Sequence, residues 1–410
     1  MAFHRLSQID KELEAATLKL LAYCQENNWA GYDPYDAVNS KVFTVLPFLN
    51  SRFPRLFLTQ LLKRSPINVR SVLLVPKTQN PKAIALFLSA YLKLSRIGVG
   101  ITENLIPLMI GRLGELRSEG EQYPCWGYSF PWQTRTIVVP RGAPNLVCTA
   151  FVGSALLDAF EQTHDTKCLA MAVGAAEYIL NKLYWTEGDS VAGFSYPVPL
   201  LRGHVPNANF LGADLLCRVT KHTGDGKFLT PALRVARYSA GSQQENGSWS
   251  YGKASSQQWI DNFHTGYNLL ALRSIGRCAG TAEFESCVER GFRFYRSHFF
   301  RNDGAPKYFH DRTYPIDIHC VAQSIITLVA FRDLDPSNGS LARSVFRWAM
   351  DHMWDDRGFF YYRVLRSCTI KTSYMRWSQA WMALAMATLL SEPERTVGEP
   401  KASADFSRVS

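Results

Sequence analysis

Two short stretches of the sequence combine acids, bases and aromatic side chains that could perform catalysis. In "WIDNFHTG", Asp261 stands three residues before His264, and this spacing puts both side chains on one face of a helix. In "TYPIDIH", Tyr314 and Asp317 stand just before His319. Carboxylates, imidazoles and phenols are groups that donate and accept protons in enzymes. The two stretches are therefore candidate catalytic segments.

We predict that Asp261, His264, Asp317 and Tyr314 are catalytic. Further polar and aromatic residues are predicted to bind the substrate, because aromatic rings pack on the C–H face of a sugar while amides and guanidinium groups bind its hydroxyls or a carboxylate. This binding set consists of Asn262, Trp259, Arg376, His319, Asp36, Trp126, Trp249 and Arg312.

Each candidate also has a structural interpretation, which stays open at this point. An aspartate directly before an apolar helix is a favoured N-cap, so Asp261 and Asp317 could both be caps. A histidine can be a hydrogen-bonded core residue, tryptophans fill cores, and Arg376 can stack between its aromatic neighbours. The spacing of His310 and His319 matches no zinc signature, so we predict neither a metal nor a cofactor.

The elements that would position these residues form a repeat. Five times, an amphipathic helix is followed by a turn with glycine and aromatic residues and then by a second, apolar helix. The turns are centred on Gly127, Gly193, Gly247, Gly304 and Gly358, at steps of 66, 54, 57 and 54 residues. An earlier, less regular copy surrounds Gly31. About six helical hairpins can close a ring. We therefore predict an all-α (α/α)6 toroid with short β-turn arms in its loops.

In such a ring, the second helix of each hairpin would be an inner helix whose first turn opens at the mouth of a central cleft. Each turn glycine is predicted to end its helix as a C-cap, with the aromatic residues behind it packed on the helix end. We expect residues 1–390 to form this single domain. Residues 391–410 are rich in Ser, Pro, Glu and Lys and are predicted to be a disordered tail.

The hairpin repeat resembles the (α/α)6 toroid shared by six-hairpin glycosidases, several polysaccharide lyases and sugar epimerases. More narrowly, the chain resembles a bacterial family encoded with polysaccharide biosynthesis genes. The motifs that carry this second resemblance are "GYDPYDAVNS", "NPKAIALFLSAYLKL", "WIDNFHTG", "YPIDIH" and "YMRWSQAWM". The resemblance covers nearly the whole predicted domain. It implies a glycan substrate and association with a membrane polysaccharide assembly system, but it implies no reaction.

Three functions are open, and an enzyme that cleaves or modifies a glycan leads. A glycoside hydrolase needs two carboxylates about 5 to 9.5 Å apart, for which Asp261 and Asp317 are the best pair and Asp36 a substitute. A uronate lyase or C5 epimerase needs a group that neutralises the sugar carboxylate, which Arg376 or Asn262 could supply, and a base, which His264 or Tyr314 could supply. A non-catalytic glycan-binding or assembly protein needs neither set. Terpene cyclases also use rings of α-helices, but we reject this function. Such an enzyme needs an Asp-rich motif in an apolar cavity, and this sequence offers only "WDDR" in a predicted turn.

The bulk composition limits the partners. The 410 residues carry a formal charge of +10, which favours an anionic or lipid-linked glycan, but the basic residues look scattered, so we predict no nucleic-acid partner. The N-terminal stretch carries charges throughout, and the longest apolar run, residues 83–92, is too short to cross a bilayer. Nine cysteines without a CxxC motif are expected to be buried, reduced thiols. These features predict a soluble, cytoplasmic protein without a transmembrane segment.

Overall fold

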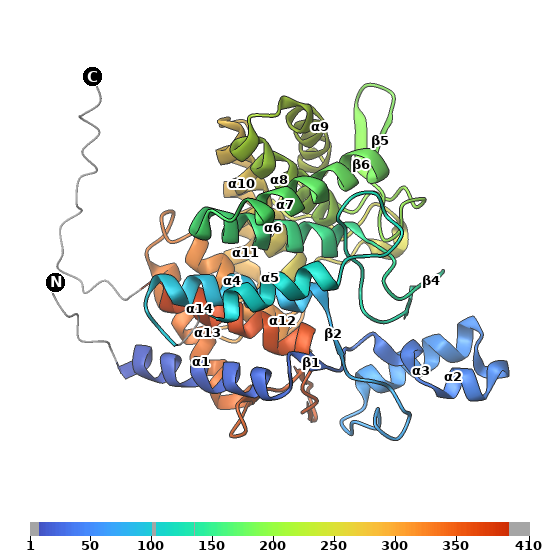
Figure 1. Ribbon diagram of the computed structural model, residues 1–410. Helices are drawn as coiled ribbons and strands as arrows, with labels where there is room; N and C mark the ends of the chain where they lie inside the picture. The colour runs from blue at the N-terminus through green and yellow to red at the C-terminus, as the bar shows by residue number, and fades with distance from the viewer. Residues whose placement is uncertain (1–7, 101–103, 135, 393–410) are drawn as a thin grey trace.

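Six helices of the described chain pack side by side into a closed ring (Figure 1). The computed structural model describes residues 8–100, 104–134 and 136–392. Each ring helix packs against the next one along the chain, and α14 packs against α4, which closes the ring. These inner helices are α4 (Pro81–Arg96), α6 (Leu146–Thr163), α8 (Pro206–Thr223), α10 (Asn262–Ala279), α12 (Ile318–Ala330) and α14 (Ala380–Leu390).

A second set of helices covers the ring from outside. Each outer helix packs mainly on one inner helix, and α1, the first helix of the chain, packs on α14, the last. The outer helices are α1 (Gln8–Glu26), α5 (Leu105–Glu115), α7 (Thr166–Tyr178), α9 (Leu229–Ala240), α11 (Glu285–His298) and α13 (Ser337–Met353). The predicted (α/α)6 toroid is confirmed, and the apolar second helices of the repeat are inner helices as expected.

Local sequence signals set the ends of the inner helices. Asn80, Asn145, Asp261 and Asp317 are the N-cap residues of α4, α6, α10 and α12, and each side chain accepts a hydrogen bond from a backbone N–H of the first turn. At its other end, α10 stops at Gly280, whose φ of 64° lies in the left-handed region. The interpretation of Asp261 and Asp317 as caps is thus confirmed.

The turn glycines lie beyond the helix ends and are not C-caps, so that prediction is wrong. Helices α9, α11 and α13 end several residues before Gly247, Gly304 and Gly358. These three glycines have positive φ. A Cβ at Gly247 would lie 2.4 Å from the carbonyl oxygen of Arg290 in α11, and one at Gly358 would lie 2.8 Å from that of Lys19 in α1. Close approach to the next outer helix therefore requires glycine here.

Short antiparallel strands occupy the loops at the end of the ring where the inner helices begin, as predicted for the β-turn arms (Figure 1). Arg363 pairs in register with Asp317, which brings the arginine beside the first turn of α12. The two-stranded pairs are β1 (Ala30–Gly31) with β2 (Thr78–Gln79), β3 (Trp132–Gln133) with β4 (Val138–Val139), β5 (Tyr184–Glu187) with β6 (Val191–Phe194), and β8 (Trp354–Asp355) with β9 (Phe359–Phe360). A three-stranded sheet has the order β11 (Thr369–Ile370), β10 (Arg363–Val364), β7 (Ile316–Asp317).

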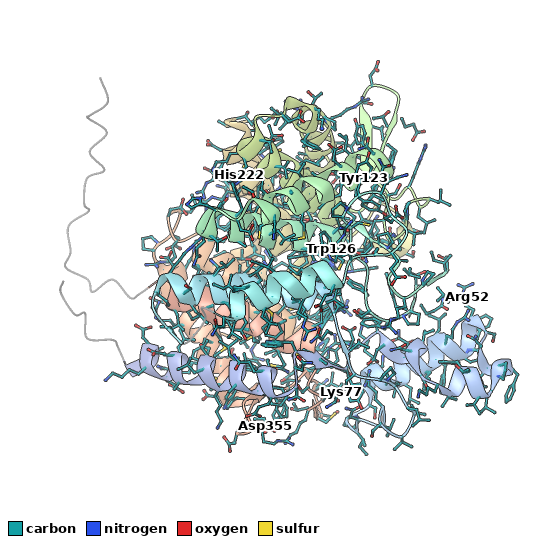
Figure 2. The ribbon with its side chains drawn as sticks, viewed as in Figure 1. Arg52, Lys77, Tyr123, Trp126, His222 and Asp355 are labelled. Carbon is teal, nitrogen blue, oxygen red and sulfur yellow. The ribbon has the colours of Figure 1, made fainter. Side chains whose placement is uncertain are left out.

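Residues 40–77 form an arm that leaves the ring between β1 and β2 (blue, lower right in Figure 1). The arm contains α2 (Val42–Val45) and α3 (Arg52–Arg64), and Figure 2 labels Arg52 at its outer part and Lys77 at its base. The sequence places this stretch inside an irregular first hairpin, so an arm beside the ring is a new element. Residues 393–410 of the predicted tail lie outside the described residues, and the single-domain organisation of residues 1–390 stays a prediction.

Candidate active site

The first turns of α10 and α12 meet the short π-helix Met375–Gln379 that precedes α14. The Phe263 and His319 rings stack with centroids 4.5 Å apart, and the His319 and Trp377 rings also have centroids 4.5 Å apart. The sequence-predicted residues that the structure places at these turns are Asp261, His264, Asp317, His319 and Arg376. Together with Lys82 of α4 and Tyr267 of α10, we call them the axial site.

Asp261 holds the His264 ring in one orientation. Its Oδ1 accepts the backbone N–H of His264 at 3.0 Å, and its Oδ2 lies 2.7 Å from His264 Nδ1. Trp259 donates its Nε1–H to the same Oδ2 at 3.0 Å and stacks on Tyr251, with ring centroids 4.5 Å apart. The Asp261 side chain is 1% exposed and the His264 side chain 21% exposed. Because Nδ1 is engaged, Nε2 is the imidazole nitrogen that can meet a ligand.

Tyr267, one helical turn after His264, contacts both His319 and Lys82. Its Oη lies 2.5 Å from His319 Nε2, and its ring centroid lies 5.5 Å from Lys82 Nζ. Burial, with the nearby charges of Lys82 and Arg376, lowers the pKa of His319 well below its usual value, so the imidazole is neutral at pH 7. Burial likewise lowers the pKa of Lys82 well below its usual range. Within the described ranges, no carboxylate forms an ion pair with Lys82.

Asp317 is fully engaged in contacts within the protein. Its Oδ1 accepts the backbone N–H of His319 and the Nε1–H of Trp377, both at 2.9 Å. Its Oδ2 accepts two hydrogen bonds from Arg363, at 2.9 Å from Nε and 2.5 Å from Nη2. The Asp317 side chain is 0% exposed. The two carboxylates expected to flank a glycosidic bond, Asp261 and Asp317, are thus enclosed and engaged, whereas a general acid or a water-activating base must reach the substrate.

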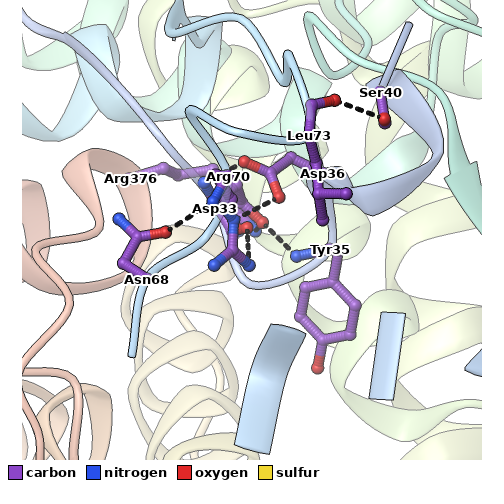
Figure 3. Close-up of polar contacts among 8 residues, drawn as sticks. All are labelled: Asp33, Tyr35, Asp36, Ser40, Asn68, Arg70, Leu73 and Arg376. Carbon is purple, nitrogen blue, oxygen red and sulfur yellow. Dashed lines mark hydrogen bonds and ion pairs between the residues drawn. The ribbon is translucent and has the colours of Figure 1, made fainter. Parts of the chain in front are cut away.

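Two buried ion pairs hold the first loop of the chain, one to the last hairpin and the other to residues just before β2 (Figure 3). Arg376 donates to Asp33 at 2.6 Å from Nε and at 2.8 Å from Nη2, and Arg70 donates to Asp36 at 2.8 Å. The Arg376 guanidinium also lies 4.7 Å from the centroid of the Tyr128 ring. The first loop therefore lies beside the last hairpin. Arg376, predicted to bind substrate, instead holds this closure through Asp33, and Asp36, also predicted to bind substrate, pairs with Arg70.

Three other members of the predicted binding set are structural. Asn262 is buried between α10, α11 and α12, where it donates to Ser324 at 3.1 Å and accepts from Tyr295 at 3.0 Å. Trp126 and Trp249 are among the largest fully buried side chains of the core. The Asn262 side chain therefore joins the inner helices α10 and α12 to the outer helix α11 through hydrogen bonds.

Two further candidates lie on the loop before α12. Tyr314 is 38% exposed, and Arg312 forms an exposed ion pair with Asp311 at 3.2 Å. No contact of either residue with the axial site occurs within the described part of the chain. The structure thus offers no support for Tyr314 as a proton acceptor at that site.

The sequence-based selection missed Lys82, Tyr267 and Arg363. Lys82 is the only charged residue in the apolar run 81–92, and a lone charge in such a run is a usable signal. Tyr267 stands three residues after His264 and so shares its helix face. Arg363 reaches the site through strand pairing between distant segments, for which the sequence carries no local signal.

A loop beside His264 also borders a cavity. Residues 250–259 double back, with the Tyr251 N–H donating to the Trp259 carbonyl at 2.9 Å, and the Tyr251 ring lies 4.7 Å from the His264 ring. Neighbouring residues of this loop line a cavity of about 500 Å³ between the start of α8 and the end of α9. This volume lies within the rough range of 300–1,000 Å³ for ligand pockets. Its polar lining includes His204, Asn209, Gln244, Ser250, Lys253 and Gln258.

Within residues 8–100, 104–134 and 136–392, no helix is long and apolar enough to cross a bilayer, and no three His, Cys, Asp or Glu side chains are grouped to hold a metal ion. The nine cysteines are free, seven of them buried, whereas Cys368 is exposed.

Comparison with known proteins supports the fold. No family model matches the sequence, and no curated protein matches it. A cellobiose 2-epimerase from Bacillus thermoamylovorans is similar with a TM-score of 0.60 and 10% identity, over 78% of this chain and 90% of that one. An unsaturated glucuronyl hydrolase from Streptococcus agalactiae has a TM-score of 0.59 and 10% identity, over 94% and 93%. A GH76 α-mannanase from Bacteroides thetaiotaomicron has a TM-score of 0.57 and 13% identity, over 75% and 85%. At such identities the likeness shows the toroid fold, and the link to a polysaccharide biosynthesis family stays a prediction.

Proposed function

We propose that the protein is a carbohydrate-active enzyme that moves a proton at a carbon beside a sugar carbonyl, as an epimerase or isomerase does. The observation that carries this proposal is the contact of 2.7 Å between Asp261 and His264 Nδ1. A buried carboxylate on Nδ1 fixes the orientation of an imidazole and keeps Nε2 as its proton acceptor. His264 is therefore the proposed base.

A second proton-transfer group stands beside the first. His319 is neutral because of its burial, and its hydrogen bond with Tyr267 at 2.5 Å gives a path by which a proton can pass between a ligand and the imidazole. Epimerisation needs a proton to leave one face of a carbon and to return to the other face. In this proposal, His264 of α10 removes the proton, and the Tyr267–His319 pair, which joins α10 to α12, returns one.

The named activities of the structural neighbours suit this chemistry. They include a cellobiose 2-epimerase, a sugar epimerase and a D-mannose isomerase. Glycoside hydrolysis, the leading hypothesis from the sequence, has less support because Asp261 and Asp317 are enclosed. Cytoplasmic location, a lipid-linked glycan and association with a polysaccharide assembly system stay proposals that rest on the sequence.

A second candidate function, uronate C5 epimerisation or lyase chemistry, is favoured by one observation. Lys82 is buried at the axial site, and no carboxylate is paired with it in the described part of the chain. A cation that neutralises the sugar carboxylate makes the neighbouring C–H more acidic, which lowers the barrier to proton abstraction. A sugar carboxylate beside Lys82 would raise the lowered pKa of this lysine and keep it protonated, with His264 again as the base.

The experiment that tests the proposal is solvent exchange in D₂O. The protein is incubated with reducing mono- and disaccharides and with uronates, and NMR follows deuterium at the carbon beside the carbonyl or carboxylate. We expect exchange with the wild type and a loss of about 10²- to 10⁴-fold in His264→Gln, because a positioned general base contributes that factor. Asp261→Asn should also lose activity but keep its fold, since Asn is an equally good N-cap.

Arg293→Gln serves as the control, because Arg293 lies on the outer helix α11 with its side chain 71% exposed. It should leave exchange unchanged. Exchange that persists in His264→Gln would refute the role of His264. Release of reducing ends without deuterium exchange would favour a hydrolase. Unsaturated products that absorb in the ultraviolet would indicate a lyase. Saturable glycan binding without turnover would indicate a non-catalytic binding protein.

A further inference from the structure

The arm, residues 40–77, concentrates positive charge in one protruding element. It carries seven basic residues and no acidic residue, while the whole chain carries +10. The interpretation that the basic residues are scattered is therefore wrong for this stretch. Figures 1 and 2 show the arm standing beside the ring, with Arg52 on its outer part.

The arm also exposes large apolar side chains. On α3, Phe53, Phe57 and Leu61 follow the i, i+4, i+8 spacing of a single helix face, and they are 78%, 70% and 48% exposed. Val45 and Phe48, which precede α3, are 72% and 76% exposed. Nine of the sixteen exposed large apolar residues of the described chain lie in the arm. Apolar side chains gathered on one protruding element indicate an interaction surface.

We propose that the arm binds the surface of membranes that contain anionic lipids. Helices that lie in the membrane interface combine a basic polar face with Phe and Leu on the other face, and basic residues gain from anionic headgroups. Charge argues against a second copy of this chain as the occupant, since Arg70 is paired with Asp36 but the other six basic residues would make two arms repel each other. A nucleic acid would satisfy the charges but would leave the phenylalanines in water.

The base of the arm is fastened next to the axial site. Lys63 of α3 donates to the Tyr35 hydroxyl at 2.8 Å, and the Tyr35 ring lies 5.6 Å from the Trp377 ring. Arg70, near the end of the arm, pairs with Asp36. A membrane-bound arm would therefore hold the axial site close to the bilayer surface. Membrane binding itself does not depend on the proposed enzymatic function.

Flotation of the full chain with vesicles tests the proposal. We expect binding to vesicles of phosphatidylcholine mixed with phosphatidylglycerol, little binding to pure phosphatidylcholine, and weaker binding at high salt. The double variant Phe53→Ser, Phe57→Ser should lower partitioning at least about tenfold, because two phenylalanines no longer leave water. Arg52→Gln, Arg64→Gln should lower both the binding and its salt dependence.

The matched control is Leu200→Ser, which makes the same kind of change at a residue that is 92% exposed but lies outside the arm. It should bind as the wild type does. All variants replace exposed residues, so their thermal unfolding should match the wild type and a folding defect would be seen directly. Equal binding to neutral and anionic vesicles would overturn the proposal, and so would vesicle binding that is unchanged in Phe53→Ser, Phe57→Ser. Preferential binding of oligonucleotides would also overturn it, as would a wild-type dimer that dissociates in Phe53→Ser, Phe57→Ser.

Discussion

Replacing Lys82 by methionine should stabilise the fold. The Lys82 side chain is buried among the rings of Phe151, Trp381 and Tyr267, with Nζ 4.1, 5.2 and 5.5 Å from their centroids. Burial is the main reason that its pKa is well below the usual value, and the charge of Arg376 adds to the effect. Methionine has a similar length and carries no charge, so it removes the desolvation cost and keeps most of the packing.

The expected gain follows from the lowered pKa of Lys82. Each unit by which folding lowers the pKa of a lysine costs about 1.4 kcal/mol at pH values where both states are protonated. We expect Lys82→Met to raise the free energy of unfolding by about 1 to 4 kcal/mol near neutral pH, as apolar replacement of buried charges often does. The unfolded chain holds the lysine proton up to about pH 10.5. The advantage of the variant should therefore be full below the folded pKa of Lys82 and should shrink as the pH rises from that value toward about 10.5.

Urea denaturation of wild type and variant at several pH values measures this difference. Lys93→Met is a matched control on the same helix, because Lys93 also has a burial-lowered pKa but lies near Asp158, which raises it. Lys93→Met should therefore gain less stability than Lys82→Met. A Lys82→Met protein that is less stable than the wild type, with an unchanged dependence on pH, would show that the ammonium is well solvated or paired and would refute the reasoning. Exchange activity should fall in Lys82→Met if the substrate is a uronate.

Three further outcomes follow from buried groups and tight contacts. The unfolded chain takes up a proton on His319 below about pH 6.5, whereas the folded state resists it, so the free energy of unfolding should fall as the pH is lowered. In urea titrations, His319→Gln should reduce this dependence of stability on pH by up to about 1.4 kcal/mol per pH unit. Asp33→Asn should cost about 3–5 kcal/mol because it leaves the Arg376 guanidinium buried without its partner, and adding Arg376→Met should recover part of the loss. Gly247→Ala should lower the melting temperature by several degrees, whereas Gly226→Ala, which meets no atom within 4 Å, should not; equal effects would contradict the close approach to α11.

Much of the fold could be predicted from local patterns. The alternation of amphipathic and apolar helices with glycine-aromatic turns is a property of consecutive residues, and so are the caps at Asp261 and Asp317. The role of the turn glycines could not be predicted. It depends on how closely Gly247 and Gly358 approach the neighbouring outer helices, which lie far along the chain.

The candidate site was predicted only in part. Asp261 and His264 are three residues apart, so their contact follows from helix geometry. The partners of Asp317 and Arg376 come from distant segments: Arg363 through strand pairing, and Asp33 through closure of the ring. No local pattern shows whether a carboxylate keeps a free oxygen, because that depends on which distant donors reach it.

The sequence by itself therefore determined the helical repeat, the ring that six hairpins close, and the Asp–His pair within one turn of helix. Only the tertiary structure decided which polar residues could act. It enclosed Asp261 and Asp317, set Lys82 among aromatic rings without a carboxylate partner in the described chain, and left the basic, apolar arm beside the ring. The physical reason is that periodicity and capping are short-range properties, whereas burial and charge pairing depend on residues that only folding brings together.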